Sequence, residues 1–291
     1  MKRLLILVAA TMAAFFAIAS QASARQASGA VPGGMARVEG GTFLMGYCPG
    51  GRSVTPMREV TVSGFYMGRF PVTQGEWYDV MGSNPSHFQG DMVPADANWR
   101  NLPVESVSWL DAVEFANARS LRAGLTPAYA INGTGASRDV TWNRAANGYR
   151  LPTEAEWEFA ARGGIVCQGN FVFSGSNTAG EVAWYWGNSG GRTREVGTLR
   201  PNALGLYDMS GNVWEWVWDW HGPYPSVAQT DPAGASSGSD RMIRGGCWSS
   251  SAFLARSAQR NSVRVAPSAR SLFVPSIWSR AIGFRLVRSA D

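Results

Sequence analysis

The segment from Gly205 to Trp216 carries the densest group of chemically useful side chains in this sequence. It places two carboxylates, those of Asp208 and Glu215, among two glycines and two tryptophans, in an order too irregular for one helix or one strand. Irregular backbone has polar N–H and C=O groups that ions, side-chain caps or arginine bridges must satisfy. A bound metal ion is one such device, and capping of loop amides by the two carboxylates is another.

The thiol of Cys247, next to Trp248, is a second candidate for chemistry. A nucleophilic cysteine needs a base or a lowered pKa. Neither histidine, His87 or His221, is close to it in sequence, so we expect a small thiol packed under Trp248. The chain has three cysteines, Cys48, Cys167 and Cys247. Their spacing does not indicate a metal cluster, and an odd number permits at most one internal disulfide, whose pair the sequence does not select.

The basic residues are almost all arginines. Lys2 is the only lysine, so Schiff-base chemistry is excluded in the rest of the chain. Nine arginines and no acidic residue lie between Arg241 and Ala290. Such a region can attract nucleic acid, anionic glycans or an acidic partner. Because these arginines alternate with serines and apolar residues, we expect a solvated, arginine-bridged surface and no nucleic-acid binding.

Residues 1–24 have the pattern of a signal peptide. A basic start is followed by the apolar run Leu4–Ala19 and by Ala22-Ser23-Ala24, a small-residue cleavage site. The run is shorter than the about 20 residues that a membrane span needs, and an uncleaved anchor is the alternative. We expect a periplasmic or secreted protein with no membrane span after cleavage. Residues 25–34 then form a flexible lead-in, and 35–291 form one domain.

Strands and helices must position these groups. Val38–Met45 and Arg58–Tyr66 alternate β-branched and aromatic residues between turn signals, which predicts two strands that pair antiparallel. Capping boxes predict three helices, and glycines end them. The boxes are Thr73 with Glu76, Ser108 with Asp111 and Thr153 with Glu156, and the terminating glycines are Gly82, Gly124 and Gly163. After Gly163 regular periodicity fades. Helices among short strands predict a mixed α+β domain.

Seven motifs occur in an order that resembles the formylglycine-generating-enzyme (sulfatase-modifying factor) family. They are Glu39–Gly46, Phe70–Thr73, Pro103–Trp109, Arg150–Glu158, Gly205–Trp216, Arg244–Trp248 and Ile282–Val287. The resemblance covers nearly the whole chain after the signal peptide. It implies that family's variant of the C-type-lectin fold, which is irregular and loop-rich.

The resemblance also implies a structural calcium ion in the segment from Gly205 to Trp216. The family's ligands align with Asp208, Gly211, Val213 and Glu215, as two side chains and two main-chain carbonyls. Calcium prefers six to eight such hard oxygen ligands. The family's other calcium site places Trp184 at its side-chain ligand, and indole cannot bind the ion, so we do not predict that site.

The family's copper site is where this chain departs from the resemblance. Active members hold copper(I) between two cysteines, and the aligned positions here are Ser250 and Ala255, with Cys247 at a neighbouring serine position. Copper(I) is soft and needs thiolates, so we expect neither copper nor formylglycine-generating oxidase activity. A non-haem iron site with three histidines is disfavoured as well, because the chain has two.

The C-terminal region is the expected binding surface for an unknown protein, peptide or glycan. In one branch of the family, retroelements diversify this region through changes at adenines. Most residues of Ser249–Leu254 and Ser262–Ile277 are reachable that way, and loss of catalytic constraint is the alternative explanation. The candidate contacts are Ser250, Phe253, Arg256, Arg260 and Arg264. The alternative function is a periplasmic enzyme, either one of metabolite maturation without copper or a formylglycine-generating oxidase with unusual metal ligands.

Overall fold

The computed structural model describes residues 31–49, 53–54, 56–134, 138–166, 170–264 and 280–290. Contacts divide the chain into Met1–Gly33 and Gly34–Asp291, and the second unit is the one analysed below. The predicted signal peptide lies outside the described residues. Within the described ranges, no helix combines the length and apolar character needed to cross a bilayer.

The N-terminal strands pair as predicted, but each expected strand is divided in two. The four strands are β1 (Met35–Val38), β2 (Gly41–Met45), β3 (Arg58–Val62) and β4 (Phe65–Gly68). β2 pairs antiparallel with β3, and β1 pairs antiparallel with β4, whose other edge carries β14 (Val287–Ser289). The first division falls at Gly40, where a Cβ atom would lie 2.8 Å from the Val62 carbonyl oxygen. Glycine therefore permits this close backbone approach.

All three predicted helices are present with their capping boxes. They are α2 (Gln74–Met81), α3 (Trp109–Arg122) and α4 (Glu154–Ala161). Each N-cap hydroxyl accepts a hydrogen bond from the N3 amide, and the N3 carboxylate accepts one from the N-cap amide. Gly82 ends α2 at φ 77°, a left-handed conformation that favours glycine.

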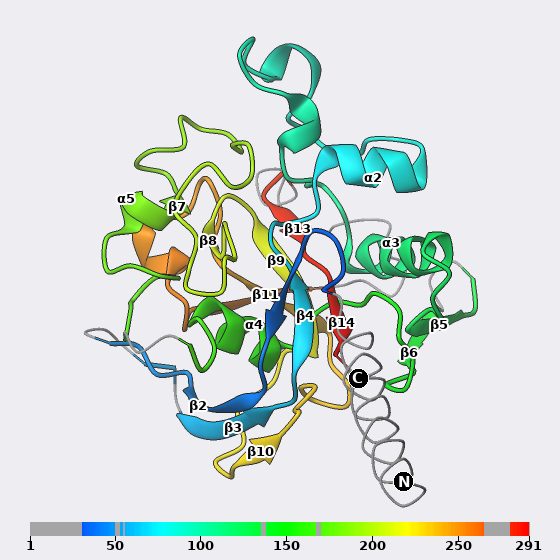
Figure 1. Cartoon of the computed structure of the whole chain (residues 1–291), viewed down its shortest axis with the longest axis vertical. Helices are drawn as coiled ribbons and strands as arrows, with labels where there is room; N and C mark the ends of the chain where they lie inside the picture. The colour runs from blue at the N-terminus through cyan, green and yellow to red at the C-terminus, as the bar shows by residue number, and fades with distance from the viewer. Residues whose placement is uncertain are drawn as a thin grey trace, which may run out of the picture. The chain divides into compact units, whose positions relative to one another are not determined.

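The second half of the chain is more regular than its sequence predicts. It forms the largest sheet, with strand order β12-β11-β9-β13. These strands are β9 (Trp214–Trp220), β11 (Asp240–Arg244), β12 (Arg260–Arg264) and β13 (Ile282–Phe284), and they lie side by side through the middle of this unit (Figure 1). β9 is buried along most of its length, so it lacks the polar alternation that marks a half-exposed strand.

Smaller elements surround this sheet. They are η1 (Gly90–Met92), η2 (Trp99–Asn101), β5 (Tyr129–Asn132), β6 (Asp139–Trp142), α5 (Ala179–Val182), β7 (Ala183–Trp184), β8 (Ser210–Gly211), β10 (Gln229–Thr230) and η4 (Ala252–Ala255). β5 and β6 form an antiparallel hairpin, and β7 pairs parallel with β8. The predicted mixed α+β, loop-rich domain is confirmed.

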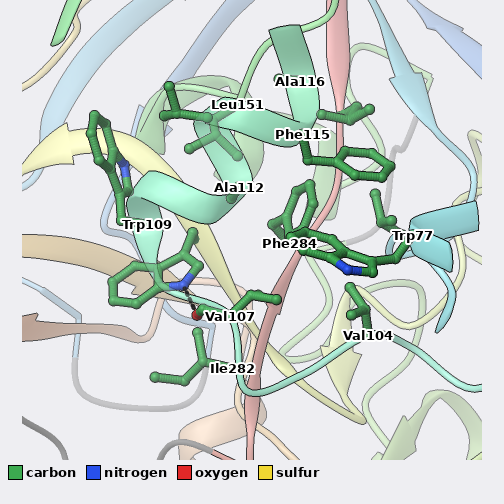
Figure 2. Packing of buried hydrophobic residues seen from close by; sticks show 14 of the residues in the cluster. Trp77, Val104, Val107, Trp109, Ala112, Phe115, Ala116, Leu151, Ile282 and Phe284 are labelled. Atoms are coloured by element: carbon green, nitrogen blue, oxygen red, sulfur yellow. Dashed lines mark hydrogen bonds between the residues drawn. The ribbon is translucent and has the colours of Figure 1, made fainter. Parts of the chain in front are cut away.

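The main core lies between α2, α3 and the sheet. Trp77 of α2 stacks on Phe115 of α3 at 5.2 Å between ring centroids, and both rings contact Phe284 of β13 edge-on. Figure 2 shows these three rings gathered on one side of α3, while Trp109, at the start of the helix, points to the other side. This packing leaves Trp109 at the boundary between the core and a cavity described below.

Candidate functional site

The segment before β9 holds two non-glycine residues, Asp208 and Asn212, in an unfavourable backbone conformation on either side of β8. Asp208, Gly211 and Asn212 have φ values of 54°, 79° and 62°, in the left-handed region. The Asp208 carboxylate accepts hydrogen bonds from the Gly197 amide at 2.8 Å and from the Asn212 side chain at 3.2 Å. Burial raises the pKa of Asp208 to about 6, although these hydrogen bonds oppose the shift. The segment therefore holds a desolvated carboxylate among turned backbone groups.

Glu215, the second residue of β9, follows this segment, and its carboxylate is already ion-paired. Arg285 donates two hydrogen bonds of 2.7 Å to it, from Nε and Nη2, and Trp157 Nε1 donates a third at 2.7 Å. The side chains of Glu215 and Arg285 are fully buried. A calcium ion at Glu215 would have to displace or approach a guanidinium group, so this carboxylate does not fit the predicted ligand role as it is arranged. Calcium binding stays a prediction that rests on Asp208 and the Gly211 and Val213 carbonyls.

The two positions predicted to replace the copper cysteines, Ser250 and Ala255, are both buried. Ser250 is buried, and its hydroxyl lies 3.1 Å from the Cys247 amide and 3.1 Å from Cys247 Sγ. Ala255 is fully buried and offers a methyl group. The prediction of a packed thiol at Cys247 is confirmed: it is 2% exposed, and it is free, as is Cys48. Cys167 lies outside the described residues.

The five predicted contact residues separate into buried and exposed ones. Arg260 is a poor candidate because its Nε and Nη2 donate to the Glu154 carboxylate at 2.9 Å each, and its guanidinium lies over the Tyr224 ring. Ser250 is equally engaged in the Cys247 turn. Phe253 is 45% exposed, and the Arg256 guanidinium lies 4.5 Å from its ring centroid. Arg264 is an exposed residue of β12, 3.7 Å from Asp240.

Sequence reasoning missed Trp186, the most exposed large apolar side chain among the described residues. It is 77% exposed, and its backbone amide donates to the Ser250 carbonyl at 2.9 Å. The neighbouring turn residues Gly187 and Asn188 were the available signal, because they indicate that this tryptophan lies in a loop rather than in the core. The Trp186 backbone is therefore adjacent to Ser250, which Phe253 follows by three positions in the chain.

The expectation of a solvated arginine surface is wrong for part of the C-terminal region. Arg241, Arg244 and Arg285 are all buried. Arg244 Nη2 donates to Glu158 at 2.6 Å and to the Ser257 carbonyl at 2.8 Å, and Arg285 holds Glu215 as described. Buried cations require such partners, which other parts of the chain supply. The acidic partners of Arg244 and Arg285 lie outside the acid-free stretch from Arg241 to Ala290, so their burial could not be predicted from the neighbouring sequence.

A buried carboxylate also lies near Trp248. Glu105 accepts hydrogen bonds from the Phe88 amide at 2.9 Å and from the Ser106 hydroxyl at 2.8 Å, and the Phe88 ring meets Trp248 edge-on. Burial raises the pKa of Glu105 to about 7, against the effect of these hydrogen bonds and of Arg280. No group of three or more His, Cys, Asp or Glu residues in the described ranges is arranged to hold a metal ion.

Comparison with known proteins identifies the family to which this fold belongs. The sequence model of the sulfatase-modifying factor enzyme 1-like domain matches residues 20–290. The chain belongs to this family. It is 42% identical over 242 residues to chaperone protein LppX of Paenibacillus barcinonensis, covering 74% of this chain and 78% of that protein. It is 32% identical over 238 residues to the formylglycine-generating enzyme of Streptomyces coelicolor, covering 74% of this chain and 61% of that enzyme.

Solved structures of family relatives agree with this fold. Treponema denticola variable protein 1 superimposes with a TM-score of 0.76 at 33% identity, covering 88% of this chain and 94% of that chain. PvdO from Pseudomonas aeruginosa gives a TM-score of 0.60 at 28% identity, with the same two coverages, 88% and 94%. The predicted family and its loop-rich α+β fold are therefore confirmed.

Proposed function

We propose that this family member is an exported binding protein that engages an acidic protein or peptide and does not oxidise cysteine. Its binding area, here called the C-terminal surface, consists of Trp186, Phe253 and Arg256. Arg264 on β12 adds a further exposed cation. The observation that carries the proposal is the exposure of two aromatic side chains whose backbones lie close to Ser250: Trp186 is hydrogen-bonded to it, and Phe253 follows it by three residues.

Exposed aromatic side chains favour a binding role because water solvates them poorly. Tryptophan and arginine are enriched among the residues that dominate binding energy at protein interfaces. Arg256 covers the Phe253 ring, which holds the ring and the charge together in one patch. Such a patch suits a partner segment that carries both apolar and acidic side chains.

Charge supports an acidic partner. The region from Arg241 to Ala290 contains no Asp or Glu, and Arg256 forms no ion pair with any residue that the structure describes. A carboxylate brought by the partner could therefore pair with Arg256 without competition from a neighbour. The relative LppX is called a chaperone protein, a name that is consistent with engagement of another polypeptide.

The alternative enzyme function would depend on buried carboxylates whose pKa is raised. Asp219 lines a small cavity of ≈ 90 Å³ with Glu154 and Tyr224, and burial raises the pKa of Asp219 to about 8. This space is well below the roughly 300–1,000 Å³ of usual ligand sites. Glu154 is also committed to Arg260 and Arg244. We therefore prefer binding over catalysis.

One experiment separates the binding function from the oxidase. Purified protein loaded with copper(I) is incubated with a sulfatase-motif cysteine peptide beside an active family enzyme, and the products are measured by mass spectrometry. We expect no formylglycine. Conversion of the cysteine would overturn the proposal.

Binding is tested on an array of peptides that alternate apolar residues with either glutamate or lysine. We expect wild-type protein to prefer the glutamate peptides, and the double substitution Trp186→Ser with Phe253→Ser to weaken binding at least about tenfold. Leu121→Ser on α3 is the matched control, because Leu121 is also apolar and exposed. Equal binding by both variants, or a preference for lysine, would exclude this surface.

Calcium is a separate proposal for the loop that contains Asp208. When bound, the ion would supply positive charge to that buried carboxylate and order the turned carbonyls of Gly211 and Val213. Calcium at about 100 times its dissociation constant should stabilise the fold by about 2.7 kcal/mol. Thermal unfolding with and without calcium, in wild type and Asp208→Asn, measures this effect. Equal calcium responses in the two proteins would rule out Asp208 as a ligand.

A further inference from the structure

A large cavity lies away from the C-terminal surface, between the start of α3, the hairpin strand β6 and the outer end of β9. Its volume is ≈ 610 Å³, within the usual range of small-molecule sites. We call it the tryptophan cavity, because Trp109, Trp218 and Trp220 line it together with Arg241. It shares no residue with the C-terminal surface, so the two proposals are independent and can be tested separately.

The guanidinium group of Arg241 is inserted between two indole rings. Its central carbon lies 3.6 Å from the ring centroid of Trp109 and 3.5 Å from that of Trp220. The two rings are nearly parallel, with centroids 6.5 Å apart. Both faces of the guanidinium are therefore covered, and only its edge can meet a ligand.

That edge has an unused hydrogen-bond donor. Nη1 donates to the Trp218 carbonyl, whereas Nε is buried and has no hydrogen-bond partner among the described residues. Arg241 is only 4% exposed, yet it lines the cavity. A buried cation with a free donor is costly unless an acceptor completes it. Burial accordingly lowers the pKa of Arg241 to about 9, although Asp219 opposes the shift.

The rest of the lining limits the charge of an incoming ligand. Arg138 and Asp139 are the other charged residues of the cavity, and Arg138 is already paired with Glu114 at 2.6 Å. Arg241 is therefore the one cation of the lining without an ion-pair partner among the described residues, and the exposed carboxylate of Asp139 disfavours a second negative charge on the ligand. A monoanion such as a carboxylate fits this site better than a dianionic phosphate.

The aromatic rings limit its shape. Trp218 is half-buried and is fixed by stacking on Tyr129, with centroids 5.1 Å apart and an interplanar angle of 9°. Trp220 is half-buried as well and is fixed by Arg241. Rigid indole faces at the wall of a cavity bind flat rings and the apolar faces of sugars.

We propose that the tryptophan cavity binds a small ring-shaped molecule carrying one carboxylate, with the ring against Trp218 and Trp220 and the carboxylate at the edge of Arg241. The ring can belong to an acidic sugar or to an aromatic acid, which share this chemistry.

The test is isothermal titration calorimetry with D-glucuronate and indole-3-acetate, each beside its uncharged amide. We expect at least one acid to bind, with its amide at least about tenfold weaker because the charged hydrogen bond is lost. The acid that binds identifies the source of the ring. Binding of neither acid, or equal binding of acid and amide, overturns the proposal.

Two substitutions locate the binding. Arg241→Met removes the cation and should lower the affinity for the carboxylate ligand at least about tenfold. Ser236→Trp fills the cavity from its exposed rim without touching Arg241, so it tests the same site should Arg241→Met fold poorly. Arg200→Met, at an exposed arginine paired with Glu181, is the matched control and should bind as wild type does. Unchanged binding in a folded Arg241→Met or Ser236→Trp protein overturns the proposal.

Discussion

Two buried arginines on the same strand have opposite environments. Arg244 points into a cluster of carboxylates from α4, where it contacts Glu154 and Glu158. Arg241, three residues earlier, lies between tryptophan rings, and among the described residues Asp219 is the carboxylate that raises its pKa. Burial lowers the pKa of both, but the carboxylates of Glu158 and Glu154 reverse the shift for Arg244 and leave its pKa raised. Arg244 is thus neutralised by the protein, and Arg241 is not.

The difference separates a structural cation from a functional candidate. The carboxylate cluster around Arg244 joins α4 to β11 and β12, because Arg260 also holds Glu154. Both of its glutamates are ion-paired, and although Arg244 Nε has no hydrogen-bond partner among the described residues, the cavity beside Glu154 has a volume of only ≈ 90 Å³, so the cluster has little capacity for a ligand. The tryptophan cavity has a cation with a free donor and space beside it. Buried charge that the fold leaves incompletely paired is the better indicator of a site.

Arg244→Met should have the largest effect on stability. It leaves Glu158 buried beside a single remaining cation, Arg162, and an unpaired buried charge costs about 3–5 kcal/mol. Urea unfolding at neutral pH measures the loss. Burial alone would raise the pKa of Glu158, but Arg162 and Arg244 lower it. Its stabilising contribution is therefore present above the ordinary pKa and is lost as the pH falls through the lowered one. A loss below 1 kcal/mol would show that the cluster does not depend on Arg244.

Asp219 connects the two regions and should make stability depend on pH. Burial first, and then the charge of Glu154, raises its pKa to about 8, so the folded protein retains a proton that the unfolded chain releases above its ordinary pKa of 3.8. Stability from this group therefore declines as the pH rises toward 8. As the pH rises from 6 to 8, the free energy of unfolding of Asp219→Asn should increase by about 1–2 kcal/mol relative to that of the wild type. Unfolding curves from pH 5 to 9 test this, and a constant difference would mean that Asp219 does not titrate there.

Arg241→Met should change stability by less than about 1 kcal/mol, in contrast with Arg244→Met. The loss of stacking on Trp109 and Trp220 is offset by removal of a poorly solvated charge, and apolar replacements of buried charges are often neutral. Urea unfolding of the two methionine variants side by side gives the comparison directly. Similar losses of several kcal/mol would remove the distinction between the two arginines.

Arg37→Gln should have the smallest effect, because its partner Glu39 and Arg37 itself are both exposed. Surface ion pairs contribute about 0–1 kcal/mol, and salt screens them. A change in the melting temperature within experimental error is expected. A loss comparable with that of Arg244→Met would mean that burial does not control how much an arginine contributes here.

Much of the fold could be predicted because its signals are local. Capping boxes such as Thr73 with Glu76 act over three residues, and the paired strands β2 and β3 are close in sequence. The four-stranded sheet was missed because β9 is buried on both faces and shows no alternation. The exposure of the candidate contact residues was not predictable from the sequence: Ser250 is buried and Arg260 is paired with Glu154, whereas Trp186 is exposed.

The sequence by itself determined the family and the three helices, since each depends on residue identity or short-range spacing. Tertiary structure alone decided which charges are neutralised. Arg241 and Arg244 have similar neighbours along the chain, but one meets carboxylates from α4 and the other meets rings from α3 and β9. Those partners are separated from them by up to 132 positions, the interval from Trp109 to Arg241. Electrostatic partnership depends on distance in space, which the local sequence does not encode.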